Sequence, residues 1–417
     1  NVSKFSITAT YIGLHRCKNM NFNETLKCTS CDQAIDCRIG MSNRLHQPLR
    51  FACPGCSAPI DIDLTFGVGM KFSGAERAEG ISPFDNTNPF VDLHLDFPVY
   101  MGEYVMGMTP FMRAITQIRP EEYQLHNARL NALNAGADNV PFFRNCLKFY
   151  RNGKIKPFQN CARQRFRVAA DSDLPQDINA TLYSLIAKVM WPFALPGQDR
   201  DTVDQYMRVI SELSQSNRQA TDAFIDEVHG TGFVKALQHD CLEIYPRILN
   251  AELALRPVLF YDFDCDFSET LLPVRVSTHD FEMYKDMYKD ITEIVSRQLV
   301  LIAGVNNLIK RGNHNEFQPG IGRLPNGRDF TPQSLNAFAD VPFGRKMDFI
   351  DDSWFTLEDA ATDNQLRNSI AHYKTNYDEV SQVIEYFPRR EGMEEERSES
   401  MQFIEFMRRI LLAYREM

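Results

Sequence analysis

The residues best suited to acid–base chemistry lie near the end of the chain, in the segment Leu-Arg-Asn-Ser-Ile-Ala-His-Tyr at 366–373. Its apolar residues recur at helical spacing, which predicts a helix with one buried stripe. Arg367 and His372 are five residues apart, and five residues turn an ideal helix through about 500°, which leaves the two side chains roughly 140° apart. One helix cannot easily direct both side chains at one atom, whereas two copies related by a two-fold axis can do so together.

The pattern Arg-polar-x-x-x-His on a late helix resembles the signature of the HEPN superfamily, all-α domains that include many metal-independent ribonucleases. The resemblance implies that Arg367 stabilises the added negative charge on a phosphorane. It implies that His372 is the general base or acid, a role for which its unperturbed pKa of about 6.5 is suited. Asn368 would orient the histidine or a phosphate oxygen. In the alternative interpretation Arg367 caps or ion-pairs a helix, and His372 is a hydrogen-bonded interior histidine.

The resemblance therefore implies an endoribonuclease that uses the 2′-OH of RNA as its nucleophile at a composite site of a homodimer. Because such enzymes occur in toxin–antitoxin and abortive-infection systems, it also implies a phage-defence toxin with an antitoxin or other regulatory partner. A second function stays open, a non-catalytic module that binds nucleic acid or a partner protein. In one HEPN subgroup a tyrosine two residues after the histidine is modified, and here Lys374 occupies that position.

Four cysteines form two Cys-x-x-Cys pairs, Cys28 with Cys31 and Cys53 with Cys56, and 21 residues separate the pairs. This spacing is typical of zinc ribbons, and four thiolates leave no open position for water, so we expect a structural zinc. No catalytic metal is expected. A redox role for the Cys-Pro-Gly-Cys pair is less favoured, because the other pair is present and no βαβ pattern surrounds it.

Residues 139–170 carry eight basic residues, no acidic residue and six aromatic residues. Cations neutralise phosphates and aromatic rings stack on bases, so this segment is a candidate track for single-stranded RNA. A pair of amphipathic helices with a basic outer face is an equally open interpretation. The candidate RNA-binding residues are Lys148, Arg151, Lys154, Lys156 and Arg163.

The composition is that of a globular protein, with 44% hydrophobic and 24% charged residues in 417. The net charge of −10 argues against general coating of nucleic acid but leaves room for a local basic site. No apolar run reaches the length of a membrane span and no secretory signal is visible. We therefore expect a cytoplasmic protein with reduced thiols.

The periodicity predicts a mainly α fold with a small β region at the N-terminus. The expected parts are a zinc ribbon over 1–72, a linker over 73–97, a helical middle region over 98–198 and a HEPN-like helical domain over 199–417. A long loop insertion is expected at 311–355, where Gly, Pro and Asn interrupt the helical pattern.

Two further sets of residues are weaker candidates for function. His314, Arg323 and Arg328 lie in the expected loop insertion and are second-rank candidates for substrate contact. Asp262, Asp264 and Asp266 alternate along the chain and are a minor candidate for a metal-binding carboxylate cluster.

Overall fold

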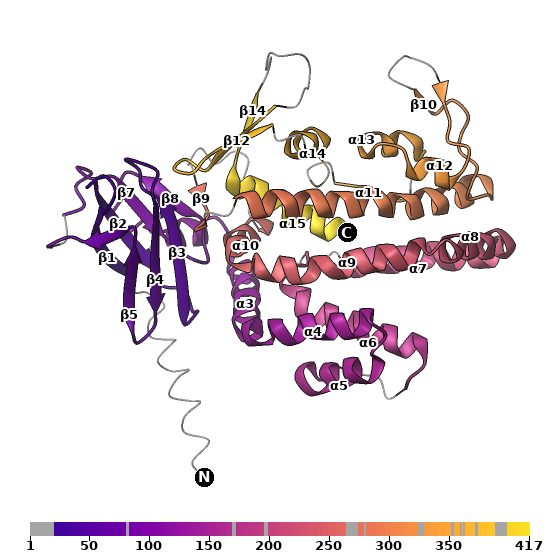
Figure 1. The fold of residues 1–417 in the computed structure, drawn as a ribbon, viewed down its shortest axis with the longest axis horizontal. Coiled ribbons are helices and arrows are strands. Elements are labelled where there is room, and N and C mark those ends of the chain that lie inside the picture. The colour runs from indigo at the N-terminus through magenta and orange to yellow at the C-terminus, as the bar shows by residue number, and fades with distance from the viewer. Residues whose placement is uncertain are drawn as a thin grey trace, which may run out of the picture.

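The protein is elongated, with a β domain at one end and helices through the rest (Figure 1). The predicted mainly α fold with an N-terminal β region is confirmed. No helix within the described ranges is long and apolar enough to cross a membrane. The computed structural model describes residues 21–80, 83–168, 172–195, 199–263, 274–278, 281–323, 329–351, 354–358, 361, 363–371, 374–387 and 398–417.

The β domain is built from two sheets whose apolar residues share one core. One sheet has the order β6-β1-β2-β7-β8-β9 and the other has the order β3-β4-β5. In β4, Ile60, Ile62 and Leu64 are buried while the residues between them are partly exposed, the alternation expected of a strand with one buried face. The strands are β1 (Asn21–Cys28), β2 (Ala34–Gly40), β3 (His46–Ala52), β4 (Pro59–Thr65), β5 (Gly69–Ser73), β6 (Ala75–Arg77), β7 (Phe90–Leu93), β8 (Val99–Gly102) and β9 (Val274–Arg275).

The prediction of a linker over 73–97 is wrong, because β6 and β7 lie within it. β6 pairs with β1, and β7 pairs in parallel with β2, a strand about fifty residues earlier. The described part of the segment predicted as a zinc ribbon therefore belongs to a larger β domain that extends to Gly102. β9, which comes from the helical part of the chain, pairs with β8 and completes the same sheet.

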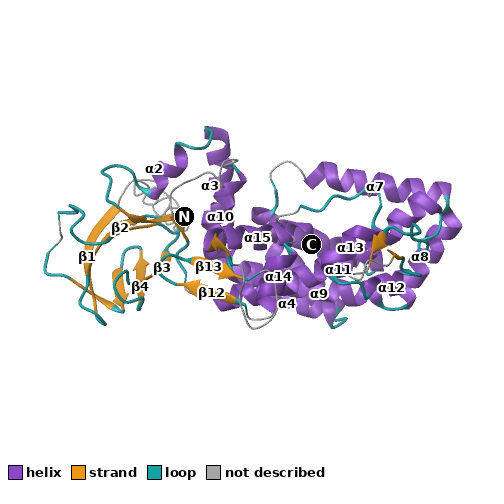
Figure 2. Cartoon of the chain, turned by 90° about the horizontal axis from the view of Figure 1, so that it is seen from above, coloured by secondary structure: helices purple, strands orange, loops and turns teal. Residues whose placement is uncertain are grey.

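The helical part packs around the 31-residue helix α11, which runs its full length and lies beside α9 and α15 (Figure 2). Proline occupies the first turn of α3, α4 and α6. A backbone N–H in the first turn makes no hydrogen bond within the helix, so proline, which lacks this N–H, costs nothing there. The helices are α2 (Pro110–Ile115), α3 (Pro120–Gly136), α4 (Val140–Arg151), α5 (Ile155–Phe166), α6 (Pro175–Met190), α7 (Asp199–Ser216), α8 (Arg218–Gly230), α9 (Phe233–Asn250), α10 (Glu252–Leu259), α11 (Phe281–Arg311), α12 (Leu335–Ala339), α13 (Phe343–Lys346), α14 (Asn364–Ala371) and α15 (Phe403–Glu416).

No separation of cores occurs at the expected boundary between 198 and 199. Phe143 and Leu182, on its N-terminal side, belong to the same buried cluster as Ile248, Tyr288 and Phe406 on its C-terminal side. The predicted middle region and the predicted C-terminal domain therefore share one hydrophobic core. A three-stranded sheet of β12 (Thr375–Asp378), β13 (Val383–Tyr386) and β14 (Glu399–Gln402) packs on it through Ile384 and Tyr386.

The segment 311–355, predicted as a long loop, is a packed layer of short elements in its described part. It contains α12, α13, β10 (Gly322–Arg323) and β11 (Asp329–Phe330). Phe317, Phe338 and Phe349 are buried against the second half of α11 and against α8. Because the elements are only two to five residues long, their periodicity is too short to be recognised in the sequence.

Cys146 and Cys161 form a disulfide that joins α4 to α5, so the prediction of reduced thiols is wrong for this pair. The two helices form a hairpin that brings these Cα atoms to 6.1 Å, a separation that a disulfide spans without backbone movement. Six other cysteines in the described part of the chain are free thiols, and four of them form the cluster described next.

Candidate functional site

The four predicted ligand cysteines come together where two hairpin turns of the β domain meet. Their sulfur atoms all lie within 4.8 Å of one another. Cys28 Sγ is 3.7 Å from Cys56 Sγ, and Cys31 Sγ is 3.7 Å from Cys53 Sγ. Tetrahedral Zn–S bonds of about 2.3 Å place sulfurs about 3.8 Å apart, so the cluster has the dimensions of a four-cysteine metal site.

The two turns that carry these cysteines have the same backbone geometry. In each turn the N–H of the first cysteine donates to the carbonyl five residues later, at 2.9 Å and 2.8 Å. In each turn the residue after the second cysteine, Asp32 or Ser57, is left-handed, with φ of 60° and 61°. Its N–H donates to the carbonyl of the first cysteine at 3.0 Å and 2.9 Å. Each Cys-x-x-Cys pair is thus held in one rigid turn, with both thiols on the same side.

Backbone amides are directed at the sulfur atoms, as metal-bound thiolates require. Burial raises the pKa of Cys28, but hydrogen bonds from the N–H groups of Ser30 and Cys31 and from the thiols of Cys53 and Cys56 together lower this pKa to about 7. At Cys53 burial prevails and raises the pKa to about 12. Because the ligands bind as thiolates, metal affinity at this cluster falls as the pH decreases.

The helix predicted around the arginine–histidine motif is α14, and it includes Arg367 and Asn368. The carboxylate of Asp363 caps its N-terminus by accepting hydrogen bonds from the N–H groups of Gln365 and Leu366 at 2.9 Å and 3.0 Å. Asp363 also pairs with Arg409, which ties α14 to α15. Leu366 and Ile370 are buried, as the predicted stripe requires. His372 lies outside the described residues.

Arg367 faces a groove beside α11, where its Nη2 is 3.0 Å from Glu293 Oε2. Its side chain is 27% exposed. Nη1 donates to Asn368 Oδ1 at 3.3 Å, while Nε is buried with no partner in the described part of the chain. The guanidinium is therefore held in place by one carboxylate and one amide oxygen, and its buried Nε–H is left without a hydrogen-bond partner among the described residues.

Arg367 and Asn368 line a pocket of about 470 Å³ between α11, α13 and α14. Lys346 is buried in its wall, where its Nζ donates to the carbonyl of Ser296 at 2.8 Å. Burial lowers the pKa of Lys346 to about 8. The charged lining residues are four cations and two carboxylates, namely Arg297, Arg345, Lys346, Arg367, Glu293 and Asp340. Cations outnumber carboxylates in this lining, and Arg297 and Arg345 also pair with Asp240 and Asp348, which do not line the pocket. The pocket can hold a phosphate or another anion where the ligand replaces one of these carboxylates.

Sequence reasoning missed Lys346, Arg345 and Arg297 as members of this site. They come from the segment 311–355 and from α11, so only the fold brings them to α14. Gly344 permits the close approach of α13, because a Cβ at this position would lie 1.8 Å from the Asn364 amide nitrogen. The feature of the sequence that indicates these residues is Gly344 followed by two cations, Arg345 and Lys346.

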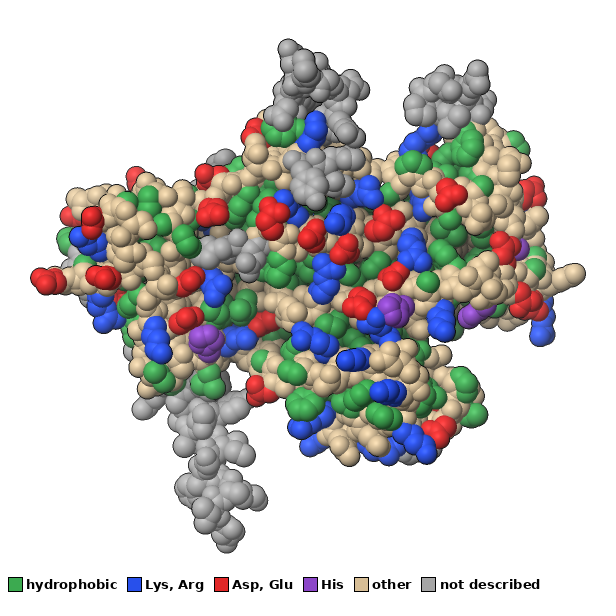
Figure 3. Space-filling view, viewed as in Figure 1, with side chains coloured by type: hydrophobic (Ala, Val, Ile, Leu, Met, Phe, Trp, Pro, Cys, Tyr) green, Lys and Arg blue, Asp and Glu red, His purple; other side chains and the backbone are tan. Residues whose placement is uncertain are grey.

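The candidate RNA-binding residues lie on the outer face of the hairpin formed by α4 and α5, where Figure 3 shows several Lys and Arg side chains. Lys148, Lys154, Lys156 and Arg163 are exposed, and Arg151 forms an ion pair with Glu243. The segment therefore presents a basic helical face.

The rings in this segment point the other way. Phe143 and Phe158 are fully buried and Phe166 is 5% exposed, because helical periodicity places them on the inner face. The prediction that these three rings stack on bases is wrong.

Among the second-rank candidates, His314 is the one whose side chain is described, and it is held in structural contacts. His314 is 7% exposed, and its Nε2 lies 2.8 Å from Glu227 Oε2. Asn315 donates to the same carboxylate oxygen at 3.0 Å, so this cluster fixes the segment after α11 to α8. The side chain of Arg323 and all of Arg328 lie outside the described residues.

Asp262 joins three helical segments and does not form a metal site. Its carboxylate pairs with Arg129 at 2.6 Å and with Arg415 at 2.6 Å, and all three side chains are at least 92% buried. Two guanidinium groups already satisfy this carboxylate. Asp264 and Asp266 lie outside the described residues.

The fold and the clusters define a mainly α protein with an N-terminal β domain that has a four-cysteine site able to hold a metal ion. Comparison with models of known families, with curated proteins and with solved structures gives no significant match. The residues of the two sites are therefore the basis for a proposed function.

Proposed function

We propose that the protein is a metal-independent endoribonuclease whose active site is the pocket beside α14. The observation that carries this proposal is that Arg367 and Asn368, selected by the sequence motif, line a pocket that also gathers Arg297, Arg345 and Lys346. Attack on a phosphodiester adds negative charge at phosphorus, and preorganised cations in a partly dry pocket stabilise that charge.

Each residue of the motif has a defined role in this proposal. His372 removes the proton of the ribose 2′-OH or protonates the leaving 5′-oxygen. Arg367 binds the non-bridging phosphate oxygens. These oxygens replace Glu293 as the partner of its guanidinium. Asn368 orients the histidine or a phosphate oxygen. The nucleophile belongs to the substrate, so RNA is cleaved to a cyclic phosphate and DNA, which lacks the 2′-OH, is not cleaved.

The direct test is cleavage of a labelled single-stranded RNA and of the DNA with the same sequence, in buffer freed of Mg²⁺ and Ca²⁺. Cleavage of the RNA alone, leaving a cyclic phosphate, supports the proposal. RNA binding without cleavage would instead favour the second function, a non-catalytic module that binds nucleic acid or a partner.

The active site is proposed to be completed by a second copy of the chain. On an ideal helix positions 367 and 372 are roughly 140° apart, so we propose that one copy supplies Arg367 and its partner supplies His372. We expect a homodimer of about 96 kDa, twice the 48.0 kDa of one chain, in light scattering of purified protein at micromolar concentration. A single species of 48 kDa across the concentration series would contradict the composite site.

We further propose that the four-cysteine cluster holds a structural Zn²⁺. A cytoplasmic phage-defence toxin that an antitoxin or regulatory partner restrains is the biological role consistent with such a nuclease. This role depends on the HEPN resemblance alone, and its test is growth arrest on expression of the intact protein.

The exposed lysines of α4 and α5 are expected to contribute to RNA affinity through phosphate contacts. Replacing Lys154 and Lys156 with alanine should make the slope of log affinity against log salt shallower by about 0.7 per lost contact with a single strand. The measurement is fluorescence anisotropy of a labelled RNA at several salt concentrations. Lys71→Ala in the exposed part of β5 is the matched control. An unchanged slope in the double variant would show that this face does not contact RNA.

A further inference from the structure

A second cavity, of about 610 Å³, lies at the junction of the β domain and the helices. It shares no lining residue with the pocket beside α14. Its wall combines small and apolar residues with four cations, and its lining residues are Arg44, Ala132, Leu133, Ala135, Gly136, Ala137, Asn139, Val140, Arg165, Phe166, Arg167, Lys188, Val189, Trp191, Pro192, Leu249, Asn250, Glu252 and Leu253. Its size is within the range of small-molecule sites.

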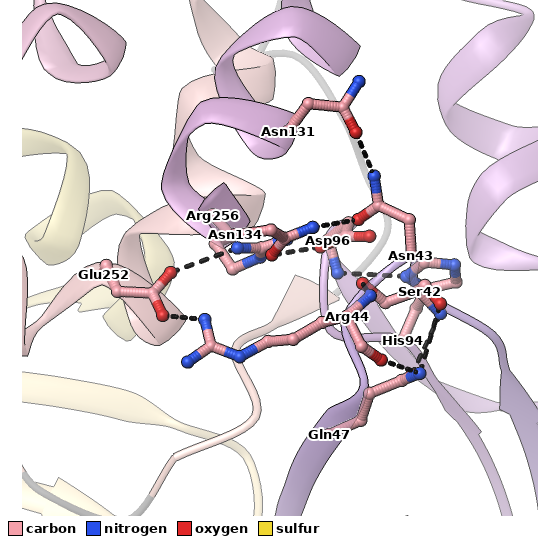
Figure 4. A network of polar contacts seen from close by, with 10 residues as sticks. All are labelled: Ser42, Asn43, Arg44, Gln47, His94, Asp96, Asn131, Asn134, Glu252 and Arg256. Atoms are coloured by element: carbon pink, nitrogen blue, oxygen red, sulfur yellow. Dashed lines mark hydrogen bonds and ion pairs between the residues drawn. The ribbon is translucent and has the colours of Figure 1, made fainter. Parts of the chain in front are cut away.

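One side of the cavity is fixed by a network of polar contacts between the two parts of the molecule (Figure 4). Glu252 of α10 forms ion pairs with Arg44 of the β domain and with Arg256. Arg256 is fully buried and also pairs with Asp96 at 2.7 Å. These four charges form three ion pairs that link the β domain to α10, although Arg256 Nη2 is buried without a hydrogen-bond partner in the described part of the chain. The ion pairs hold this wall of the cavity in place.

Other lining residues of the cavity are positively charged. Arg165, Arg167 and Lys188 line it and are exposed to solvent. No acidic side chain in the described part of the chain pairs with Arg167 or Lys188. Glu252 is the one carboxylate among the lining residues, and its charge is already neutralised by Arg44 and Arg256. The cavity therefore presents unneutralised positive charge to a ligand.

An aromatic surface lies in the same cavity. Trp191, one of two tryptophans in the chain, lines the cavity from the short 3-10 turn η2 (Trp191–Phe193). The residue is 39% exposed. Val140 and Val189 extend the apolar wall, and the small residues at the end of α3 leave space for a flat ring. A ring that stacks on an indole gains affinity without any base-specific hydrogen bond.

We propose that this cavity binds a nucleoside monophosphate, with its base against Trp191 and its phosphate at Arg167 and Lys188. A ligand needs both a flat aromatic group and a phosphate to use both surfaces, and one nucleotide fits the cavity. The site is independent of the proposed ribonuclease activity. The cavity wall includes Arg44 of the β domain and Glu252 of α10, so the proposed site lies where the two parts of the molecule meet.

The test uses the fluorescence of Trp191. Trp354→Phe leaves Trp191 as the single tryptophan of the chain, and titration with AMP is expected to quench its emission. Removing a cation that bonds the phosphate should weaken AMP binding about tenfold or more, so Arg167→Ala and Lys188→Ala are made in the Trp354→Phe protein. Adenosine and inorganic phosphate, each of which satisfies one surface, should bind at least tenfold more weakly than AMP.

Lys71→Ala, far from the cavity in β5, is the matched control and should bind AMP as the parent does. Thermal melting checks that each variant is folded. No change in emission at millimolar AMP would overturn the proposal, as would unchanged affinity in both cation variants. Phosphate binding as tight as AMP binding would overturn the role of Trp191. Quenching by an RNA oligomer but not by AMP would assign the cavity to RNA.

Discussion

Replacing Arg367 with alanine is expected to lower the rate of RNA cleavage by about 10²–10³-fold, the effect of removing one preorganised charge-stabilising donor. His372→Ala should cost a comparable or larger factor, about 10²–10⁴-fold, because it removes proton transfer. Both rates would be measured under single-turnover conditions with saturating enzyme, so that a weaker affinity for RNA is not mistaken for a slower chemical step.

The Arg367→Ala protein should remain folded. Arg367 pairs with Glu293, whose side chain is 55% exposed, and an ion pair with so exposed a partner contributes little to stability. Arg218→Ala is the matched control, because Arg218 also forms an ion pair with a carboxylate on a helix surface, that of Asp222, and lies outside the pocket. Its rate should equal that of the unaltered protein.

Two results would contradict the assignment of the active site. If Arg367→Ala and His372→Ala fold and cleave RNA at the original rate, the nuclease activity comes from another site or another protein. If His372→Ala aggregates, the histidine has the interior structural role that the sequence left open. After the second result, Arg367→Ala still tests whether this pocket is the active site, because Arg367 is on the surface of α14 and its loss should not unfold the protein.

The parts of the structure that the sequence predicts depend on short-range patterns. The Cys-x-x-Cys spacing specifies a turn of six residues, and the same turn forms twice. Helix α11 has 31 residues, which gives enough turns for its apolar periodicity to be clear in the sequence. The buried stripe of α14 follows from Leu366 and Ile370 in the same way.

The parts that the sequence does not predict depend on contacts between distant residues. β7 consists of four buried residues, and its partner β2 is some fifty residues away, so no local signal distinguishes it from a turn-rich linker. Lys346 becomes a member of the pocket beside α14 only because α13 packs on α11. A cation in a short, irregular segment gives no indication of the site to which it belongs.

For residues 139–170 the sequence leaves two interpretations open, and the structure agrees with the pair of amphipathic helices that has a basic outer face. Phe143, Cys146, Leu147 and Tyr150 recur at steps of three, one and three, which places them on one face of α4. In such a segment the helical periodicity predicts buried rings, whereas the composition suggests exposed rings that stack on bases. Burial of a phenylalanine ring stabilises the fold, and an exposed ring does not gain this free energy. The basic residues then occupy the outer face because they are the residues that remain.

The other large effect is expected at the metal cluster, where Cys28→Ser should abolish metal binding and unfold the β domain. A structural zinc contributes about 10–16 kcal/mol of apparent binding free energy, and whole domains are stable by only about 5–15 kcal/mol. Loss of one of four thiolates therefore removes a term as large as the stability of the domain. Elemental analysis should find one zinc per chain in the unaltered protein and none in the variant. Cys241→Ser, a free thiol on α9 outside the cluster, should keep its zinc.

The helices should survive the loss of the β domain, which hydrogen exchange can establish. The β domain has its own apolar core around Cys28, Cys53 and Ile62, while α11 and α15 belong to a separate core. Amides of β1–β4 should exchange rapidly in Cys28→Ser while those of α11 stay protected. Exchange at α10 should rise moderately, because Arg256 loses Asp96 but keeps Glu252. A folded unaltered protein without metal would show that the domain is stable with four free thiols. Protected β strands in the variant would show that the β domain folds without the complete cluster.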